Sequence, residues 1–277
     1  MKRHKICKII FAILAVFLCV AFYELIGICI TYKKQPAVSD ATIKETQNIM
    51  SVAGRENTER AVIIEKNSQA LLERVRLIQN AKDEIILSTF AFKSDESGKL
   101  ILGALHDAAD RGVHVRILVD GMESWIDMEG NPYFYGLSSH ENVEIKLYNK
   151  ANPLKPWKTM GRMHDKYLIA DGKIYILGGR NTYNYFLGDF PGHKNFDRDV
   201  LVVCDEPQKD NSVNQLWNYF ETIWEQEDCR YFHNSKKLAD RQSVKKAVLE
   251  LQEGYQQYFD DNKERLCDTD YADETFE

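Results

Sequence analysis

The sequence predicts an α/β protein with a mixed, largely parallel sheet flanked by helices, preceded by one transmembrane helix. A strand, a helix and a second strand follow one another between residues 84 and 119, the order of a parallel crossover unit. Two apolar runs are then joined by Asp171-Gly172, a typical two-residue hairpin turn. Near the N-terminus, the apolar run from Ile9 to Ile30 has the length of a bilayer-spanning helix, about 20 residues.

The N-terminal segment 1–34 is predicted to be an uncleaved signal anchor. Its apolar run is longer than that of most signal peptides and contains one acidic residue, Glu24. More bases precede the run than follow it closely, so the N-terminus is expected in the cytoplasm and the body outside the cell membrane. A cleaved signal peptide is the alternative. The bases before the run are Lys2, Arg3, Lys5 and Lys8, and those after it are Lys33 and Lys34.

Three later segments show the spacing of helices that cover a core. Apolar residues recur at intervals of three and four within 68–82, 98–111 and 213–227. Gly112 follows the second segment at the position where a helix C-cap belongs. These segments are predicted to be helices.

Short runs of β-branched and aromatic residues are predicted to be strands. The first two flank the helix at 98–111 and complete the crossover, and two others form the hairpin around Asp171-Gly172. The predicted strands are 84–92, 113–119, 143–148, 163–170, 173–177 and 200–204.

Composition along the chain suggests four parts. The anchor at 1–34 is followed by a polar linker at 35–60 and then by a catalytic lobe at 61–227. The remainder, 228–277, is polar and then acidic. It is predicted to be either a C-terminal tail or the start of a bridge to a second lobe.

The charge distribution makes nucleic acid an unexpected partner. The chain has 36 basic and 42 acidic side chains, and six of the bases but only one acid lie in residues 1–34. The body therefore carries a net charge of −11, from 30 bases and 41 acids. Proteins that bind the phosphate backbone of nucleic acids depend on an excess of cationic side chains. The body of this chain has no such excess. The cysteines have no zinc-site spacing, so no structural metal is predicted.

The residues that carry chemistry lie between residues 162 and 186. His164 and Lys166 are two apart on a predicted strand, so their side chains are expected on one face. Gly178, Gly179 and Asn181 follow the next strand. Ammonium and amide groups neutralise phosphate oxygens, and an imidazole can attack phosphorus or protonate a leaving oxygen. The pattern therefore predicts a phosphate-binding catalytic site.

This stretch resembles the phospholipase D superfamily. The spacing His164-x-Lys166-x4-Asp171-x6-Gly178-Gly179-x-Asn181 matches the HxK(x)4D(x)6GG/GS(x)N motif of that superfamily. The similarity extends from about Val62 to Trp224 and is strongest to the bacterial cardiolipin synthase branch. It implies a covalent phosphohistidine formed from a phosphodiester, resolved by water or by an alcohol, with no metal or organic cofactor.

The resemblance also implies roles for the matching residues. His164 would be the nucleophile or its acid–base partner, Lys166 and Asn181 would bind phosphate, and Gly178 and Gly179 would form the pocket floor. Asp171 belongs to the motif and is kept as a catalytic candidate, although its place in a hairpin turn indicates a structural role.

Two further carboxylates are catalytic candidates. Asp197 and Asp199 are two apart near the last predicted strand, and either could hold the second nitrogen of the His164 imidazole, as a carboxylate does in catalytic triads. The spacing does not choose between them. Solvated loop acids are the alternative interpretation of both.

Only one copy of the motif is present, whereas the family's chemistry uses two histidines. Three explanations of the single copy are a homodimer, a separate second lobe and an inactive remnant.

The sequence predicts a membrane-anchored phosphodiesterase or phosphatidyltransferase of the cardiolipin synthase type, with phospholipid as substrate. The alternatives are a metal-independent phosphodiester nuclease, or a half-enzyme that only binds phospholipid or a partner lobe.

Overall fold

Contacts between residues divide the chain into two compact units. One comprises residues 1–57 and 151–162, and the other comprises 58–150 and 163–277. The predicted linker at 35–60 lies mostly outside the described residues. The computed structural model describes residues 2–33, 39–41, 43–44, 59–150, 152, 154–158, 160–204 and 211–271.

The first unit contains the predicted N-terminal helix. Helix α1, Lys2–Lys33, is continuous, and its segment Lys5–Ile30 spans 26 residues with a mean hydropathy of 2.7. This segment is long and apolar enough to cross a membrane, although a signal sequence at the N-terminus would have the same properties. The unit also contains the short 3-10 helix η1, Pro156–Lys158.

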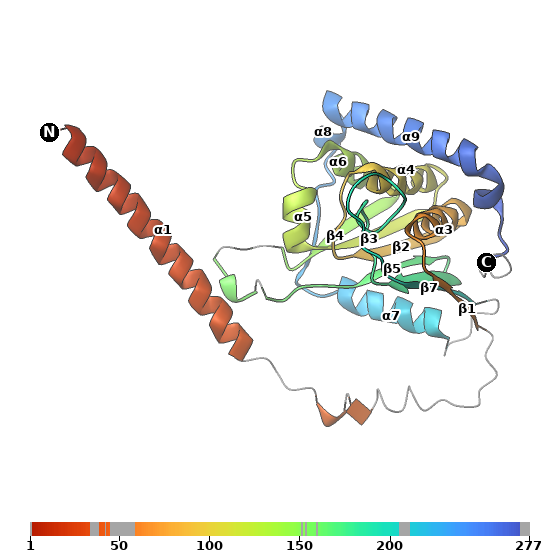
Figure 1. The fold of residues 1–277 in the computed structure, drawn as a ribbon, viewed down its shortest axis with the longest axis horizontal. Helices are drawn as coiled ribbons and strands as arrows, with labels where there is room; N and C mark the ends of the chain where they lie inside the picture. The colour runs from red at the N-terminus through yellow and green to blue at the C-terminus, as the bar shows by residue number, and fades with distance from the viewer. Residues whose placement is uncertain are drawn as a thin grey trace. The chain divides into compact units, whose positions relative to one another are not determined.

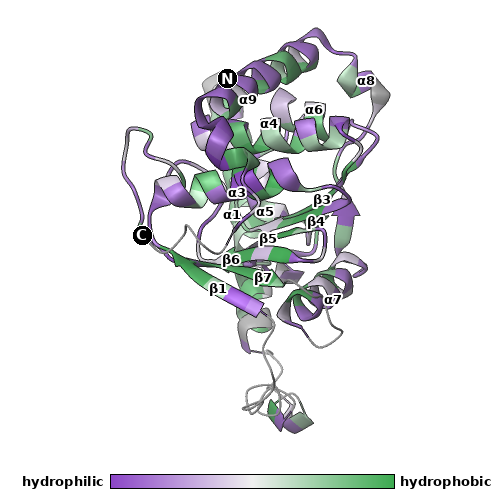
Figure 2. Cartoon of the chain, turned by 90° about the vertical axis from the view of Figure 1, so that its right-hand side faces the viewer, coloured by the Kyte–Doolittle hydropathy of each residue, from purple (hydrophilic) through white to green (hydrophobic). Residues whose placement is uncertain are grey.

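One eight-stranded sheet forms the centre of the second unit, in the order β1-β7-β6-β5-β2-β3-β4-β8. Most residues of its strands are hydrophobic and are drawn green in Figure 2, whereas hydrophilic residues of β1 are drawn purple. The strands are β1 Glu59–Ile64, β2 Glu84–Thr89, β3 His114–Asp120, β4 Val143–Tyr148, β5 Lys166–Ala170, β6 Ile174–Gly178, β7 Asp199–Cys204 and β8 Cys229–Tyr231.

The predicted mixed α/β fold is confirmed, but the parallel part of the sheet is smaller than expected. Only the pairs β2–β3 and β3–β4 are parallel among the described strands, and the other neighbouring pairs are antiparallel. The reason is connectivity. Crossover helices join β2 to β3 and β3 to β4, whereas the Asp171-Gly172 turn forces β6 to run back beside β5.

Helices cover both faces of the sheet. Helices α3, α4 and α6 lie on one face with α9 packed across them, and α7 lies on the other (Figure 1). Successive side chains of a strand point to opposite faces of the sheet. In β2, Ile85 and Leu87 belong to the larger core, and Ile86 packs in the core beneath α7. The helices are α3 Asn67–Asn80, α4 Glu96–Asp110, α5 Gly121–Asp127, α6 Pro132–Ser138, α7 Ser212–Trp224, α8 Lys236–Ala239 and α9 Gln242–Cys267.

Three features of this unit differ in detail from the sequence-based expectation. Strand β1 begins inside the predicted linker and pairs with β7. Strand β5 starts at Lys166, so His164 lies just before the strand and not within it. The segment predicted as a tail or bridge contains β8 and α9, and buried α9 residues such as Leu251 and Tyr255 belong to the main core.

Candidate active site

The candidate residues gather at one edge of the sheet. Strands β2 and β3 end there at Thr89 and Asp120, and β5 begins there at Lys166. Strand β6 ends there at Gly178 beside the first residue of β7, Asp199. Loops that leave the carboxyl ends of parallel strands commonly form ligand sites, and the antiparallel strands add their own ends to this one.

His164 and Lys166 contact the same aromatic ring. The exposed His164 imidazole lies against Phe90, with 4.6 Å between the ring centroids. Lys166 is 5% exposed, and its Nζ lies 5.3 Å from the centre of the same ring and donates a hydrogen bond of 2.7 Å to the His164 carbonyl oxygen. Burial lowers the pKa of Lys166, while the negative charges of Asp165 and Asp197 oppose this shift.

The segment that carries His164 is held on both sides. The backbone N–H of Met163 donates to Oδ2 of the buried Asp120 at 3.1 Å. The other carboxylate oxygen of Asp120 caps the start of α5. On the far side of His164, the Tyr219 hydroxyl of α7 donates to the Asp165 carboxylate at 3.0 Å. The imidazole therefore projects from a segment that is hydrogen-bonded at the residue before it and at the residue after it.

The two glycines leave room for the two aspartate carboxylates. A Cβ added to Gly178 would overlap Oδ1 of Asp199, and one added to Gly179 would overlap the carboxylate of Asp197. Only glycine permits such close approach, because every other residue has a Cβ. The structure thus places both acids directly against the motif's glycine pair.

The environments of the two acids are different. Asp199 has a fully buried side chain, and its carboxylate lies 2.9 Å from an Nη of Arg74 and 3.3 Å from an Nη of Arg180. Arg180 is itself buried and donates to backbone oxygens of Ile64 and Glu65. Burial lowers the pKa of Arg180, and the charge of Asp199 opposes that shift. Asp199 is thus the centre of an internal ion-pair cluster.

Asp197, by contrast, is half-buried in the segment just before β7. Its carboxylate accepts a hydrogen bond from the backbone N–H of Arg198 at 2.8 Å. Since its charge acts on Lys166 and its oxygens lie over Gly179, Asp197 belongs to the surface of the candidate site.

Asn181 lies deeper at the same edge. It is 6% exposed, and its side-chain oxygen accepts a hydrogen bond from the N–H of Ala91 at 3.2 Å. This bond fixes the amide plane and orients its NH₂ group as the donor that remains for a ligand.

Asp171 lies at the opposite end of β5 from Lys166. It occupies the hairpin turn with φ of 52°, and its carboxylate accepts hydrogen bonds of 2.8 to 3.2 Å from the N–H groups of residues 82–84. The structure therefore separates this motif residue from the other candidates. Its contacts tie the hairpin to the start of β2.

Two residues of the site were not identified from the sequence. Phe90 lies within the predicted strand 84–92 and directly follows β2, which ends at the edge where the other candidates gather. Its place near the end of a predicted strand could have indicated it. Asp120 directly follows the predicted strand 113–119, but its role in holding Met163 depends on a contact over 43 residues. Within the described parts of the chain, no three His, Cys, Asp or Glu side chains come together as a metal site would require.

The sheet with its flanking helices, and the pattern of His164, Lys166, the glycine pair and Asn181 at its edge, are those of a phospholipase D-like protein. Comparison with known families agrees with this class. The chain belongs to the family described as cardiolipin synthase, PLD-like domain, which matches residues 75–224.

Individual relatives are similar over part of their length. Cardiolipin synthase C of Escherichia coli (strain K12) is 29% identical over 154 residues, which is 50% of this chain and 31% of that protein. The chain spans about a third of the length of this relative and of two others that it matches, 31% to 35%.

Solved structures were compared with this chain as well. Phosphatidylserine synthase of Haemophilus influenzae Rd KW20 has a TM-score of 0.52 at 15% identity, covering 79% of this chain and 48% of its own. At this identity the similarity shows a related fold alone. NucT from Helicobacter pylori has a TM-score of 0.49 at 16% identity, covering 63% of this chain and 99% of its own, and no conclusion is drawn from it.

Proposed function

We propose that this chain is a membrane-anchored phosphodiesterase or phosphatidyltransferase of the cardiolipin synthase type, acting on glycerophospholipids through a phosphohistidine. The observation that supports it most is the exposed imidazole of His164 beside the buried ammonium of Lys166. The family relationship supports the reaction class. The net charge of −11 outside the anchor disfavours nucleic acid as substrate.

In this proposal a ring nitrogen of His164 attacks phosphorus, and the bond from phosphorus to the leaving alcohol breaks. The Lys166 ammonium and the Asn181 amide balance the charge that builds up on the non-bridging oxygens. Gly178 and Gly179 let the phosphate approach the backbone.

Asp197 is the acid that we propose to orient the His164 imidazole through its second nitrogen. Asp199 is the less suitable candidate, because its carboxylate already lies between Arg74 and Arg180. An acid that balances two buried guanidinium groups cannot leave them without a large cost.

The leaving alcohol needs a proton, and this chain has one copy of the motif. We propose that a second histidine comes from another copy of the chain or from a separate lobe. Activity of a homodimer would rise faster than linearly with protein concentration below the dissociation constant, which distinguishes a dimer from a self-sufficient monomer.

Helix α1 supports a proposal for the location of the reaction. We propose that α1 crosses the cell membrane once, with the N-terminus in the cytoplasm and the catalytic unit outside. Labelling of single-cysteine variants with a membrane-impermeant reagent tests this orientation: a cysteine at an exposed position of the catalytic unit should react in intact cells, and one before Ile9 should not.

The central test uses the purified full chain with phosphatidylglycerol over a range of protein concentrations, with products identified by mass spectrometry. His164→Ala should abolish lipid turnover and the covalent phosphoenzyme. His114→Ala is the matched control, since His114 lies at the opposite end of the sheet, at the start of β3. Unchanged turnover in His164→Ala would refute the proposal. Metal-independent DNA nicking that His164→Ala abolishes, without lipid turnover, would establish the nuclease instead.

A further inference from the structure

Asp165 lies in the sequence between His164 and Lys166, the two residues expected to act on phosphate, although a carboxylate repels phosphate. The alternation of side chains shows how the segment accommodates it. Along β5, Tyr167 packs in the core beneath α7, whereas Leu168 belongs to the larger core on the other face. Continued to the residues just before the strand, this alternation places Asp165 on the α7 face and His164 with Lys166 on the other.

On the α7 face, the Asp165 carboxylate meets the hydroxyl of Tyr219, which donates a hydrogen bond of 3.0 Å to Oδ2. The Tyr219 ring is supported from β5, because the buried Tyr167 ring meets it edge-to-face with 6.5 Å between the centroids. Burial, and then the charge of Asp165, raises the pKa of Tyr219 to about 12. The hydroxyl therefore keeps its proton at neutral pH and remains a donor to the carboxylate.

The Asp165 carboxylate is also near enough to the Lys166 ammonium to act on it. Burial lowers the pKa of Lys166, and the charges of Asp165 and then Asp197 oppose this shift. Within the part of the chain that the structure describes, the ammonium nevertheless donates to the His164 carbonyl oxygen and forms an ion pair with neither acid. The cation beside His164 is thus not neutralised by a carboxylate.

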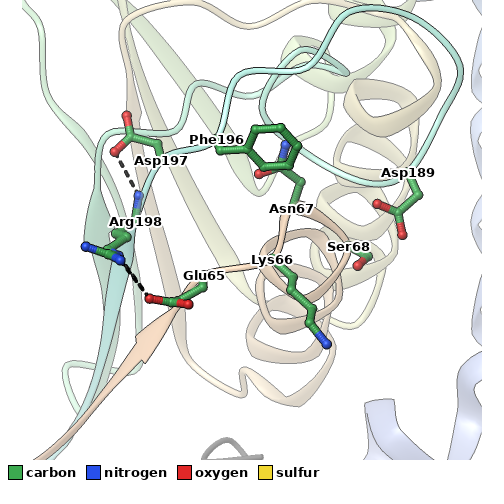
Figure 3. A pocket seen from close by; sticks show the side chains of 8 residues that line it. All are labelled: Glu65, Lys66, Asn67, Ser68, Asp189, Phe196, Asp197 and Arg198. Atoms are coloured by element: carbon green, nitrogen blue, oxygen red, sulfur yellow. Dashed lines mark hydrogen bonds and ion pairs between the residues drawn. The ribbon is translucent and has the colours of Figure 1, made fainter.

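Both acids near Lys166 are bonded to other donors. The Asp197 carboxylate accepts the backbone N–H of Arg198 at 2.8 Å, and the Arg198 side chain pairs with Glu65, as the dashed lines in Figure 3 show. Asp165 is held instead by a side-chain hydroxyl from another element, α7. Of these two bonds, the one to Asp165 can therefore be removed by changing a single side chain.

A carboxylate released beside an ammonium would compete with phosphate for it. Opposite charges a few ångströms apart attract strongly where water is partly excluded, and Lys166 is 5% exposed. An ammonium shared with Asp165 would offer less positive charge to a phosphate. The Tyr219 hydroxyl opposes this competition, because it bonds the carboxylate on the opposite face of the strand.

We propose that Tyr219 is a positioning residue that holds the Asp165 carboxylate on the α7 face and thereby leaves the Lys166 ammonium to the substrate phosphate. This inference rests on the proposed function and deepens it, since it names a residue outside the motif on which phosphate binding depends. Tyr219 touches no substrate in this assignment and acts through Asp165.

The test begins with Tyr219→Phe, which removes the hydroxyl and keeps the ring that meets Tyr167. The full chain in detergent micelles is titrated with inorganic phosphate at about pH 6.5, which favours the ammonium form of Lys166, and phosphatidylglycerol turnover is measured in parallel. Tyr219→Phe should weaken phosphate binding about fivefold, the effect of a competing, partly exposed ion pair. The KM for lipid should rise by the same factor with little change in kcat, because the lost attraction acts equally before and during the reaction.

Asp165→Asn distinguishes positioning from a structural role. The amide cannot form an ion pair with Lys166, so adding Tyr219→Phe to Asp165→Asn should change neither phosphate binding nor KM. A structural role of Tyr219 would weaken both to the same degree with or without Asp165→Asn. Tyr231→Phe is the matched control, since it removes a tyrosine hydroxyl that donates to the Glu144 carboxylate at 2.9 Å near the start of β4, and it should have no effect.

Thermal unfolding shows that each variant is folded, and titration of Lys166→Met measures any phosphate bound outside this site. Unchanged binding in Tyr219→Phe, or an equal loss with and without Asp165→Asn, would overturn the inference. So would an unmodified protein that binds no phosphate at Lys166, or loss of turnover in Asp165→Asn, which would make the acid a participant in the reaction. The expected loss and rescue of phosphate binding without lipid turnover by the unmodified protein would support the inference and refute the proposed function.

Discussion

The ammonium group of Lys166 donates a hydrogen bond of 2.7 Å to the carbonyl oxygen of His164. The cation expected to bind phosphate is thus bonded to the backbone of the residue expected to attack it. The bond places a positive charge within the site before any ligand arrives, in a side chain that is 5% exposed. Because burial lowers the pKa of Lys166, the ammonium group loses its proton at a lower pH than an ordinary lysine does.

Activity should decrease as the pH rises, and the decrease should begin at a lower pH than it would if Lys166 had the pKa of an ordinary lysine. Burial lowers the pKa of Lys166, so the ammonium form needed to bind phosphate is lost earlier. In the window between this lowered pKa and the ordinary value, the unfolded state binds more protons, so stability should rise with pH. Lys166→Met should abolish turnover without lowering the unfolding temperature. A rate profile and thermal melts across pH 7 to 11 measure both effects, and a basic limb unchanged in Lys166→Arg would contradict the assignment.

Removing the charge of Asp199 should mainly lower the stability of the protein, whereas removing the charge of Asp197 should mainly lower its turnover. Asp199→Asn leaves Arg74 and Arg180 without a buried counter-charge and should lower the free energy of unfolding by about 3–5 kcal/mol. Asp197→Asn should leave the stability within about 0.5 kcal/mol, because the residue is partly exposed, but should reduce turnover. Urea denaturation and lipid turnover of both variants provide the measurement. A stable Asp199→Asn with altered pH dependence of turnover would reverse the two roles.

The glycine pair should tolerate no side chain. In Gly178→Ala the new Cβ would overlap the buried Asp199 carboxylate, and overpacking of this kind costs roughly 1–3 kcal/mol. In Gly179→Ala it would displace Asp197, so turnover should fall more than stability. Gly254→Ala is the control, since nothing lies within 4 Å of a Cβ added there on α9. The control should be neutral or more stable by up to about 1 kcal/mol, and equal destabilisation of all three variants would refute the close-approach argument.

Asp171 should matter for stability and not for catalysis, despite its place in the motif. Its carboxylate accepts hydrogen bonds from the backbone at residues 82–84 in a turn at the far end of β5. Asp171→Ala should therefore lower the free energy of unfolding by about 1–3 kcal/mol, because buried or turn N–H groups lose their acceptor. The KM for lipid should be unchanged at a temperature where the variant is folded. Loss of kcat in a variant of normal stability would contradict this.

Phe90 should act as a positioning residue. Its ring contacts the His164 imidazole and lies 5.3 Å from the Lys166 ammonium, an arrangement that stabilises cations by about 0.5–2 kcal/mol. Phe90→Leu should reduce kcat by about three- to thirtyfold with little change in KM, because His164 and Lys166 lose the ring that they contact. Phe90→Tyr keeps the ring and should restore kcat. A purely structural role would lower the stability of Phe90→Leu without lowering kcat at a temperature where the variant is folded.

Periodicity along the chain was sufficient to locate most elements of the fold. The strand at residues 143–148 has the predicted bounds, and the crossover at 84–119 and the hairpin lie within a few residues of those expected. Such elements are local, since hydrophobic spacing and turn residues act over a few positions. Strand β1 was not predicted because its first two residues belong to the polar linker and only four apolar residues follow them. Its pairing with β7 joins positions about 140 apart.

The motif likewise predicted which residue types would carry the chemistry, because their spacing is a property of the chain. It did not assign their surroundings. Asp197 and Asp199 are equivalent in spacing, and only packing against Arg74 and Arg180 separates a surface acid from an internal one. The roles of Phe90, Asp120 and Tyr219 depend on contacts between distant segments. The burial of a side chain and its charged partners depend on how the strands assemble. The residue pattern was therefore sufficient to predict the reaction class. The individual roles of the side chains could be proposed only from the folded edge of the sheet.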